Sequence, residues 1–319
     1  MIIDWQHHYY PEELVKKHRA EPGGSSAGWI DSYYQIDEHL SHMDVAGIDI
    51  AVLSCWNPPV DECQFINDRL AQLQREYPNR FVGLAHVAPF NTQEALAELD
   101  RAITGLGLKG VATVAQPQGR PLDSPELWPF YEKVSALGVP IFVHATSGIP
   151  RFGFAPGFET ALKAPYSIGS SLGWEFDLAL AATRLIMGGV LVDFPDLKWV
   201  IAHLGGGLYA IKERLERQLP SAAGSRVPGT FREHFEKLYF DMTGFGGGTM
   251  AEGAGMIAVK CALLAIKPQK LVFATDFPLG VGSVGPGMKQ YVDNIRKLGL
   301  PAQDTEAILG GNAKALLKL

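Results

Sequence analysis

The feature that most constrains this chain is an alternation of short apolar runs with helical patterns. Eight runs rich in β-branched and aromatic residues each end in a polar or glycine-rich stretch. We predict strands at residues 2–7, 48–56, 81–88, 108–115, 139–146, 198–205, 238–245 and 270–277. Between them lie amphipathic segments such as 61–78 and 92–107, in which apolar residues recur at helical spacing.

Strands of this kind, alternating with helices, indicate a parallel sheet that helices cover on its outer face. Eight such units in 319 residues favour a (β/α)8 TIM barrel over an open doubly wound sheet. We find no linker, so we predict a single domain over residues 1–319. The longer connections 11–34 and 147–170 directly follow strands, which places them as substrate loops at the mouth of the barrel.

Composition and charge exclude several kinds of protein. The formal net charge is -6 and the pI is about 5.9, which argues against nucleic acid as a partner. The three cysteines show no C-x-x-C spacing, as expected for reduced thiols in a cytoplasmic protein. We find no signal peptide and no apolar stretch of the roughly 18 residues that would span a membrane.

Five polar residues lie at or near the ends of predicted strands: Gln6, His8, His144, His203 and Asp276. Gln6 and His8 are two apart, so both should point into the barrel, whereas His7 should face the helices. A lone histidine at a strand end is usually structural. Several on different strands converge at one barrel mouth, so we predict a shared site of the kind found in metal-dependent barrel hydrolases.

The remaining histidines have simpler interpretations. We expect His86, inside the third strand, to be structural, and we expect surface or structural roles for His18, His39, His42 and His234. The stretch "GLGLKG" (105–110) matches a dinucleotide-binding fingerprint, but a helix precedes it and a strand follows. Because the fingerprint needs the reverse order, we interpret its glycines as a helix end.

Several longer stretches carry a family resemblance, among them "IDWQHHYYP", "LGWEFDLALAATRLIMGG", "KWVIAHLGGG", "LYFDMTG" and "VFATDFPLG". Over essentially its whole length the chain resembles the amidohydrolase superfamily. It is most similar to the branch of aminocarboxymuconate-semialdehyde decarboxylase and the resorcylate and carboxyvanillate decarboxylases. The resemblance implies one divalent metal, zinc for a His/Asp donor set or alternatively manganese, held by Gln6, His8, His144 and Asp276.

One position departs from the family pattern. Members carry histidine or glutamate where this chain has Gln6, whose neutral amide is a weaker ligand. The metal could therefore be held mainly by His8, His144 and Asp276, with Gln6 weakly bound or just outside, or the site could be partly degenerate.

The resemblance implies a non-oxidative decarboxylase acting on an aromatic or muconate-like carboxylic acid, with His203 and Asp276 as the acid–base pair. Arg120 and Arg151 are weak candidates to bind a carboxylate, since a solvated surface arginine is the simpler interpretation of each. Trp56 could cover a ring or equally be part of the barrel rim. Two alternatives stay open: a metal-dependent hydrolase of a lactone or amide, and a catalytically silent carboxylate-binding barrel. The branch and the apolar segment 27–34 together predict a homodimer or higher even oligomer.

Overall fold

The computed structural model describes residues 1–21, 29–55, 58, 60–88, 90–146, 168–218, 227–243, 256–279 and 285–319. Eight parallel strands form one sheet in the order β1 to β8. Backbone hydrogen bonds then join β1 to the chain around β8: Trp5 N donates to Phe273 O at 2.8 Å, and Asp276 N donates to Gln6 O at 2.9 Å. The sheet therefore closes on itself, which confirms the predicted (β/α)8 barrel.

Seven strands lie inside their predicted runs, and β1 extends one residue past its run of 2–7. The strands are β1 (Ile3–His8), β2 (Ile50–Ser54), β3 (Phe81–Ala85), β4 (Gly110–Val114), β5 (Ile141–His144), β6 (Trp199–Ile201), β7 (Tyr239–Asp241) and β8 (Leu271–Val272). The predictions for β6 and β8 are wrong beyond residues 201 and 272. A short helix, α9 (His203–Gly206), follows β6. His203, Leu204 and Asp276 have positive φ angles of 52°, 53° and 61°, which a strand does not accommodate.

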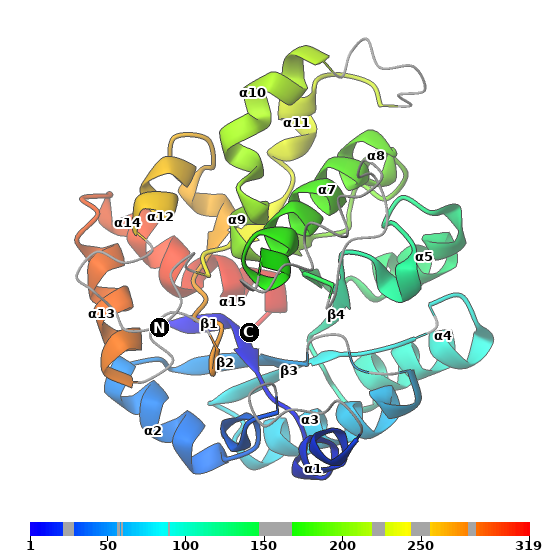
Figure 1. Ribbon diagram of the computed structural model, residues 1–319, viewed down its shortest axis with the longest axis vertical. Helices are drawn as coiled ribbons and strands as arrows, with labels where there is room; N and C mark the ends of the chain where they lie inside the picture. The colour runs from blue at the N-terminus through cyan, green and yellow to red at the C-terminus, as the bar shows by residue number, and fades with distance from the viewer. Residues whose placement is uncertain are drawn as a thin grey trace.

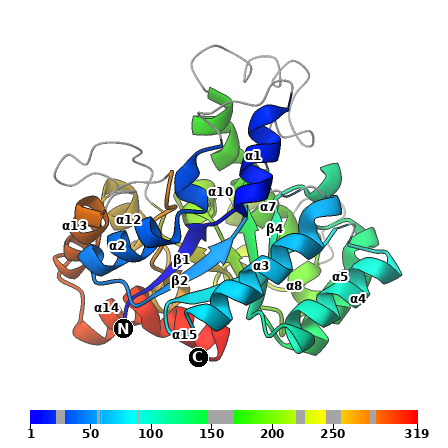
Figure 2. The same ribbon diagram turned by 90° about the horizontal axis from the view of Figure 1, so that it is seen from below.

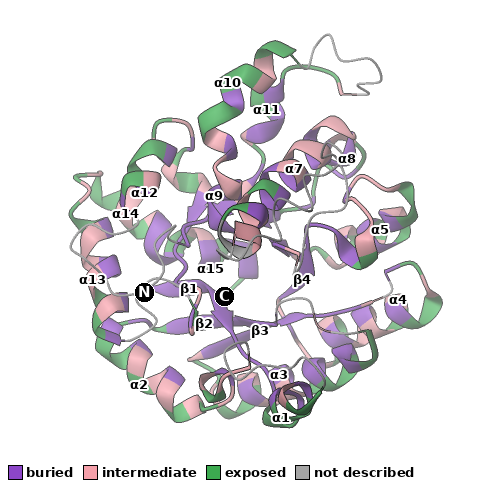
Figure 3. Cartoon of the chain, viewed as in Figure 1, coloured by how far each residue is buried: buried purple, intermediate pink, exposed green. Residues whose placement is uncertain are grey.

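A ring of helices surrounds the strands (Figure 1). The helices are α1 (Glu12–Ala20), α2 (Ile36–Ala46), α3 (Cys63–Glu76), α4 (Gln93–Asp100), α5 (Trp128–Leu137), α7 (Trp174–Met187), α8 (Val190–Asp193), α10 (Leu208–Gln218), α11 (Phe231–Phe235), α12 (Met256–Ala262), α13 (Gly285–Arg296), α14 (Ala302–Glu306) and α15 (Asn312–Leu317). Single turns lie at η1 (Asp31–Tyr33), η2 (Val60–Glu62), η3 (Arg101–Gly105), η4 (Pro117–Gly119), η5 (Pro125–Leu127), η6 (Gly169–Gly173), η8 (Pro268–Lys270) and η9 (Ala307–Gly311). Burial follows this arrangement, with buried strands and exposed outer helix faces (Figure 3).

Seen from the side, both termini lie at the end of the barrel opposite α1 (Figure 2). Since α1 follows the carboxyl end of β1, the mouth of the barrel is at the α1 end. The connection predicted over 11–34 contains α1 and η1, so it is partly helical, and its residues 22–28 lie outside the described residues. Residues 147–167 of the second predicted loop also lie outside them.

The apolar segment 27–34, from which we argued for an oligomer, packs only partly against its own chain where the structure describes it, and Trp29, Ile30 and Tyr34 keep some exposed surface. Trp29 stacks on His18 at 4.5 Å and meets Tyr10 edge-on at 5.1 Å, and Tyr33 is fully buried. The homodimer or higher even oligomer stays a prediction. Within the described ranges, no helix is both long and apolar enough to cross a membrane.

Candidate metal centre

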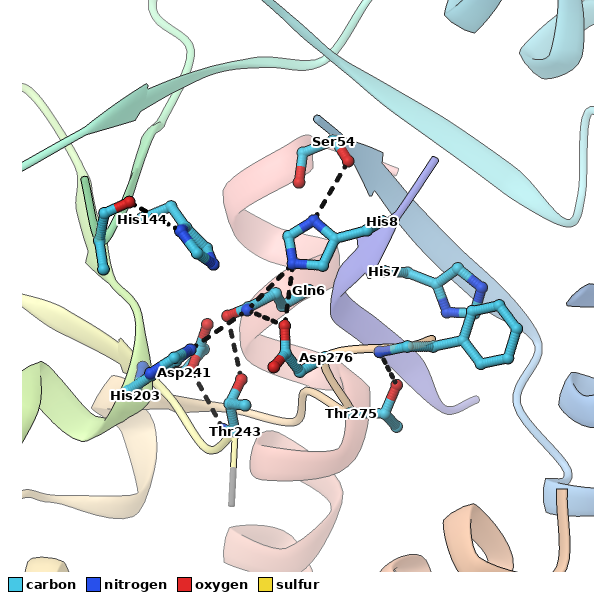
Figure 4. Close-up of polar contacts among 12 residues, drawn as sticks. Gln6, His7, His8, Ser54, His144, His203, Asp241, Thr243, Thr275 and Asp276 are labelled. Carbon is cyan, nitrogen blue, oxygen red and sulfur yellow. Dashed lines mark hydrogen bonds and ion pairs between the residues drawn. The ribbon is translucent and has the colours of Figure 1, made fainter. Parts of the chain in front are cut away.

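Three side chains from distant parts of the sequence meet at the mouth of the barrel (Figure 4). His8 is the last residue of β1, His144 is the last residue of β5, and Asp276 follows β8. Each offers one ligand atom, and these atoms lie within 4.8 Å of one another. Two imidazoles and one carboxylate are the donor set of an open catalytic site for zinc or a similar divalent cation. The residues therefore fit a metal.

The two histidines are held in the orientation that a metal ligand needs. Nδ1 of His8 lies 3.4 Å from the carbonyl oxygen of Ser54, and Nδ1 of His144 lies 3.0 Å from that of Ala145. A carbonyl only accepts, so Nδ1 of each ring carries a hydrogen, and Nε2 is the nitrogen that would bind a metal. Without a metal, a hydrogen on Nε2 of His8 makes the hydrogen bond to Asp276. Burial, with the nearby charges of His8 and His203, lowers the pKa of His144 to about 3, so His144 is neutral as metal binding requires.

Asp276 is the acidic member of the cluster. Its Oδ1 lies 2.9 Å from Nε2 of His8 and 2.5 Å from Nε2 of Gln6. Burial by itself would raise the pKa of this carboxyl group. The hydrogen bond and charge of His8 and the charge of His203 oppose burial and bring the pKa of Asp276 down to about 2. An ionised carboxylate suits a ligand better than a proton donor.

Gln6 lies among these groups, but its carbonyl oxygen faces away from them. Its amide nitrogen is 3.4 Å from Nε2 of His8 and 3.3 Å from Nε2 of His203. Its Oε1 accepts a hydrogen bond from Oγ1 of Thr243 at 3.0 Å. In this structure Gln6 therefore acts as a hydrogen-bond donor to Asp276, and the atom that could bind a metal is used by Thr243.

His203 borders the cluster and is held by two acidic residues that the sequence analysis missed. Its Nδ1 lies 2.9 Å from Oε1 of Glu175, and its backbone N–H donates to Oδ1 of Asp241 at 2.8 Å. Burial would lower the pKa of His203, but the charges of Glu175, Asp276 and Asp241 raise it to about 10. His203 is thus an imidazolium near neutral pH, with Nε2 towards the cluster.

The glycines after β6 explain how Glu175 reaches His203. A Cβ atom on Gly206 would lie 1.8 Å from the carbonyl oxygen of Glu175, so only glycine lets α7 approach this closely. Spacing could not reveal Glu175, which lies 28 residues before His203. The one signal was its place in "LGWEF", a stretch that carries the resemblance.

His7 faces away from the cluster, as strand alternation predicted. Its Nδ1 is 2.8 Å from Oδ2 of Asp4, and its Nε2 is 3.1 Å from Nδ1 of His39. His39 is fully buried and its Nε2 donates to the carbonyl of Ser32 at 2.8 Å, so the surface alternative for His39 is wrong and the structural one is confirmed.

These outward residues also fix the segment that carries Asp276. Asp4 accepts hydrogen bonds from the N–H and the hydroxyl of Thr275, at 2.8 and 2.6 Å. The His7 ring stacks on Phe277 with 4.6 Å between centroids. Both chain neighbours of Asp276 are therefore held by β1, which places the carboxylate opposite His8.

The structure describes one of the three residues that we predicted to bind substrate. Arg120 bonds to Glu126 and Gln118, and none of its contacts with described residues leads to the cluster. Trp56 and Arg151 lie outside the described residues. The substrate contacts of all three stay predictions.

A closed (β/α)8 barrel with two histidines, an aspartate and a charged histidine at its mouth defines a metal-dependent barrel of the amidohydrolase kind. The sequence model of the amidohydrolase family matches residues 3–319, and the chain belongs to this family. The predicted family is therefore confirmed.

Two relatives and one solved structure show which members of the family the chain is similar to. The chain is 28% identical to 2-amino-3-carboxymuconate-6-semialdehyde decarboxylase of Dictyostelium discoideum, covering 89% of this chain and 76% of that one. It is 26% identical to gamma-resorcylate decarboxylase of Polaromonas sp., and the match covers 89% of this chain and 87% of that one. A Polaromonas dihydroxybenzoic acid decarboxylase with bound manganese and the inhibitor 2-nitroresorcinol has the same fold, with a TM-score of 0.80, 23% identity and coverage of 100% and 97%.

Proposed function

We propose that this protein is a metal-dependent, non-oxidative decarboxylase of an aromatic or muconate-like carboxylic acid. The observation that carries the proposal is the cluster of His8, His144 and Asp276 beside His203, whose Nδ1 contacts Glu175 at 2.9 Å. The similarity to decarboxylases of both substrate types supports the reaction class.

His8, His144 and Asp276 would hold the metal, with the Gln6 amide as donor to Asp276. Bound there, a divalent cation supplies a fixed positive charge that orients the substrate's oxygens and stabilises negative charge on them. Zinc suits the nitrogen-rich donor set, and manganese is the alternative, as in the Polaromonas enzyme. Reconstitution of chelator-treated protein with each cation in turn decides between them.

His203 would supply the proton. In the reaction the ring carbon accepts this proton, the bond to the carboxylate carbon breaks, its electron pair returns to the ring, and carbon dioxide leaves. Glu175 accepts the hydrogen bond from Nδ1 of His203 and keeps the ring charged and oriented. The low pKa of Asp276 favours a ligand role over the acid role that we also considered for it.

Product analysis in D2O tests this reaction. Metal-loaded protein is incubated with a panel of hydroxybenzoates, and the products are identified by mass and NMR. We expect loss of carbon dioxide, with deuterium at the carbon that carried the carboxylate. A parallel assay with lactones and amides tests the hydrolase alternative, and hydrolysis without any decarboxylation would replace the proposal. Binding of a hydroxybenzoate without either reaction would support the silent barrel.

Assembly as a homodimer or higher even oligomer and a cytoplasmic location are further proposals of this account. Sedimentation at micromolar concentration tests the first, and cell fractionation tests the second.

A further inference from the structure

A pocket of about 300 Å³ opens at the carboxyl ends of β2, β3 and β4. Its wall is largely apolar, with Val60, Val87, Phe90, Val114 and Pro117. The polar side chains of His86, Thr113 and Gln118 also line it. An apolar pocket with a few placed polar groups is the usual form of a small-molecule site.

The hydrogen-bonding state of His86 can be deduced from its partners. The backbone N–H of Cys55 donates to Nε2 of His86 at 3.0 Å, so Nε2 carries a lone pair. Burial, helped by the charge of His8, lowers the pKa of His86 to about 3, so the ring is neutral. Its single hydrogen is therefore on Nδ1.

Nδ1–H of His86 is a donor without a partner among the described residues. The residue is only 3% exposed. Nδ1 is not among the polar atoms that are fully buried without a partner, so it opens towards the pocket, where an acceptor on a ligand can reach it. The hydroxyl of Thr113, also buried and without a partner in the described chain, adds a second polar group to the same pocket.

His86 is held rigidly in this orientation. The side chain of Asn67, on α3, accepts from the backbone N–H of His86 and donates to its carbonyl, both at 2.8 Å. Asn67 is itself fully buried. A donor fixed in advance in this way loses little entropy when a ligand binds.

One peptide group connects His86 to the metal centre. The carbonyl of Ser54 contacts Nδ1 of His8, and the N–H of the same peptide group, on Cys55, donates to His86. Peptide dimensions then place the two contacting ring nitrogens at most about 9 Å apart. The metal centre and the pocket therefore lie next to each other at the mouth of the barrel, on either side of this peptide group.

We propose that this pocket holds the ring of the substrate and that Nδ1–H of His86 donates a hydrogen bond to an oxygen substituent on that ring. The inference rests on the proposed function, because it places the substrate's carboxylate at the metal centre. It assigns to His86, which the sequence analysis considered structural, a role in choosing oxygenated rings.

Binding of matched ligands to wild-type protein tests the proposal without any variant. The probes are 2-hydroxybenzoates with hydroxyl, methoxy or methyl at each remaining ring position, titrated by calorimetry into manganese-loaded protein. At one ring position, hydroxyl and methoxy should both bind about tenfold more tightly than methyl, since a donor favours acceptors of either kind. Equal binding of methoxy and methyl at every position, or no binding at all, would overturn the proposal.

Variants then assign the preference to His86. His86→Leu should bring the three ligands within about twofold of one another, whereas His86→Gln, which can both accept from Cys55 and donate into the pocket, should keep the preference. The matched control is His234→Gln, because His234 lies on the outer helix α11 and is a buried histidine that donates to the carbonyl of Pro228. Should His86→Leu retain the full preference, His86 is not the donor.

Calorimetry reports binding and the product assay reports reaction, so the two proposals fail separately. A ring preference without decarboxylation would refute only the proposed function, whereas decarboxylation without a preference would refute only the role of His86.

Discussion

The amide nitrogen of Gln6 lies 2.5 Å from Oδ1 of Asp276, the oxygen that His8 also contacts at 2.9 Å. Gln6 therefore stabilises the ionised carboxylate with a neutral donor, where the related branch carries histidine or glutamate. This contact explains how a glutamine can occupy the position with the rest of the cluster intact. It also predicts what a charged side chain would do there.

Gln6→Glu should bind zinc or manganese about tenfold to a hundredfold more tightly, because a charge is added beside the cation in a partly dry site. Without metal the same variant should be less stable than wild type, since two carboxylates then face each other. Chelator competition measures the affinity, and thermal unfolding with and without metal measures the stability. An unchanged affinity would show that position 6 is too far from the metal to act on it.

His7 and His8 are neighbours in the sequence, but we predict that only the substitution of His8 removes the metal. His8→Ala should lose most of the bound metal. His7→Ala should keep the metal but lower the free energy of unfolding by roughly 2–4 kcal/mol, because Asp4 and His39 lose buried partners. Elemental analysis and denaturant unfolding of both variants check this. The reverse pattern of metal loss would mean that His7, not His8, faces the barrel.

Two adjacent glycines allow the effect of backbone strain to be distinguished from the effect of helix packing. Gly206 and Gly207 both have positive φ angles, 61° and 79°, but only a Cβ on Gly206 meets Glu175, while one on Gly207 meets nothing within 4 Å. Gly207→Ala should cost about 1–2 kcal/mol through strain alone. Gly206→Ala should cost more and should also lower kcat, because α7 and Glu175 must move away from His203. Equal losses of stability and equal kcat in the two variants would remove this link.

The Glu175–His203 pair predicts a pH dependence of stability in chelator-treated protein. Glu175 helps to raise the pKa of His203 from 6.5 to about 10, so the pair stabilises the fold fully below pH 6.5 and loses this effect as the pH rises through 10. The free energy of unfolding of Glu175→Gln should fall furthest below wild type near pH 6.5, and the gap should close towards pH 10. A gap that widens with pH contradicts the assignment.

The sequence predicted the barrel because eight buried parallel strands leave a strong apolar pattern. It also predicted which residues converge, since successive side chains of a strand point to opposite faces, so that His8 points into the barrel and His7 away from it. It could not predict the positive φ angles of His203 and Asp276, because the backbone N–H of each is held by a residue distant in sequence, Asp241 and Gln6 respectively. The roles of Glu175 and of the donor on His86 were missed for the same reason, because each role depends on a partner that is distant in sequence.

The central claim is that His8, His144 and Asp276 hold a metal on which decarboxylation depends. The most direct test measures release of carbon dioxide from carboxyl-labelled hydroxybenzoates by protein as purified, after removal of metal with a chelator, and after zinc or manganese is restored. We expect one carbon dioxide for each substrate consumed, a loss of at least about a hundredfold on removal of metal, and recovery on its return. Release that continues undiminished in metal-free protein would contradict the account.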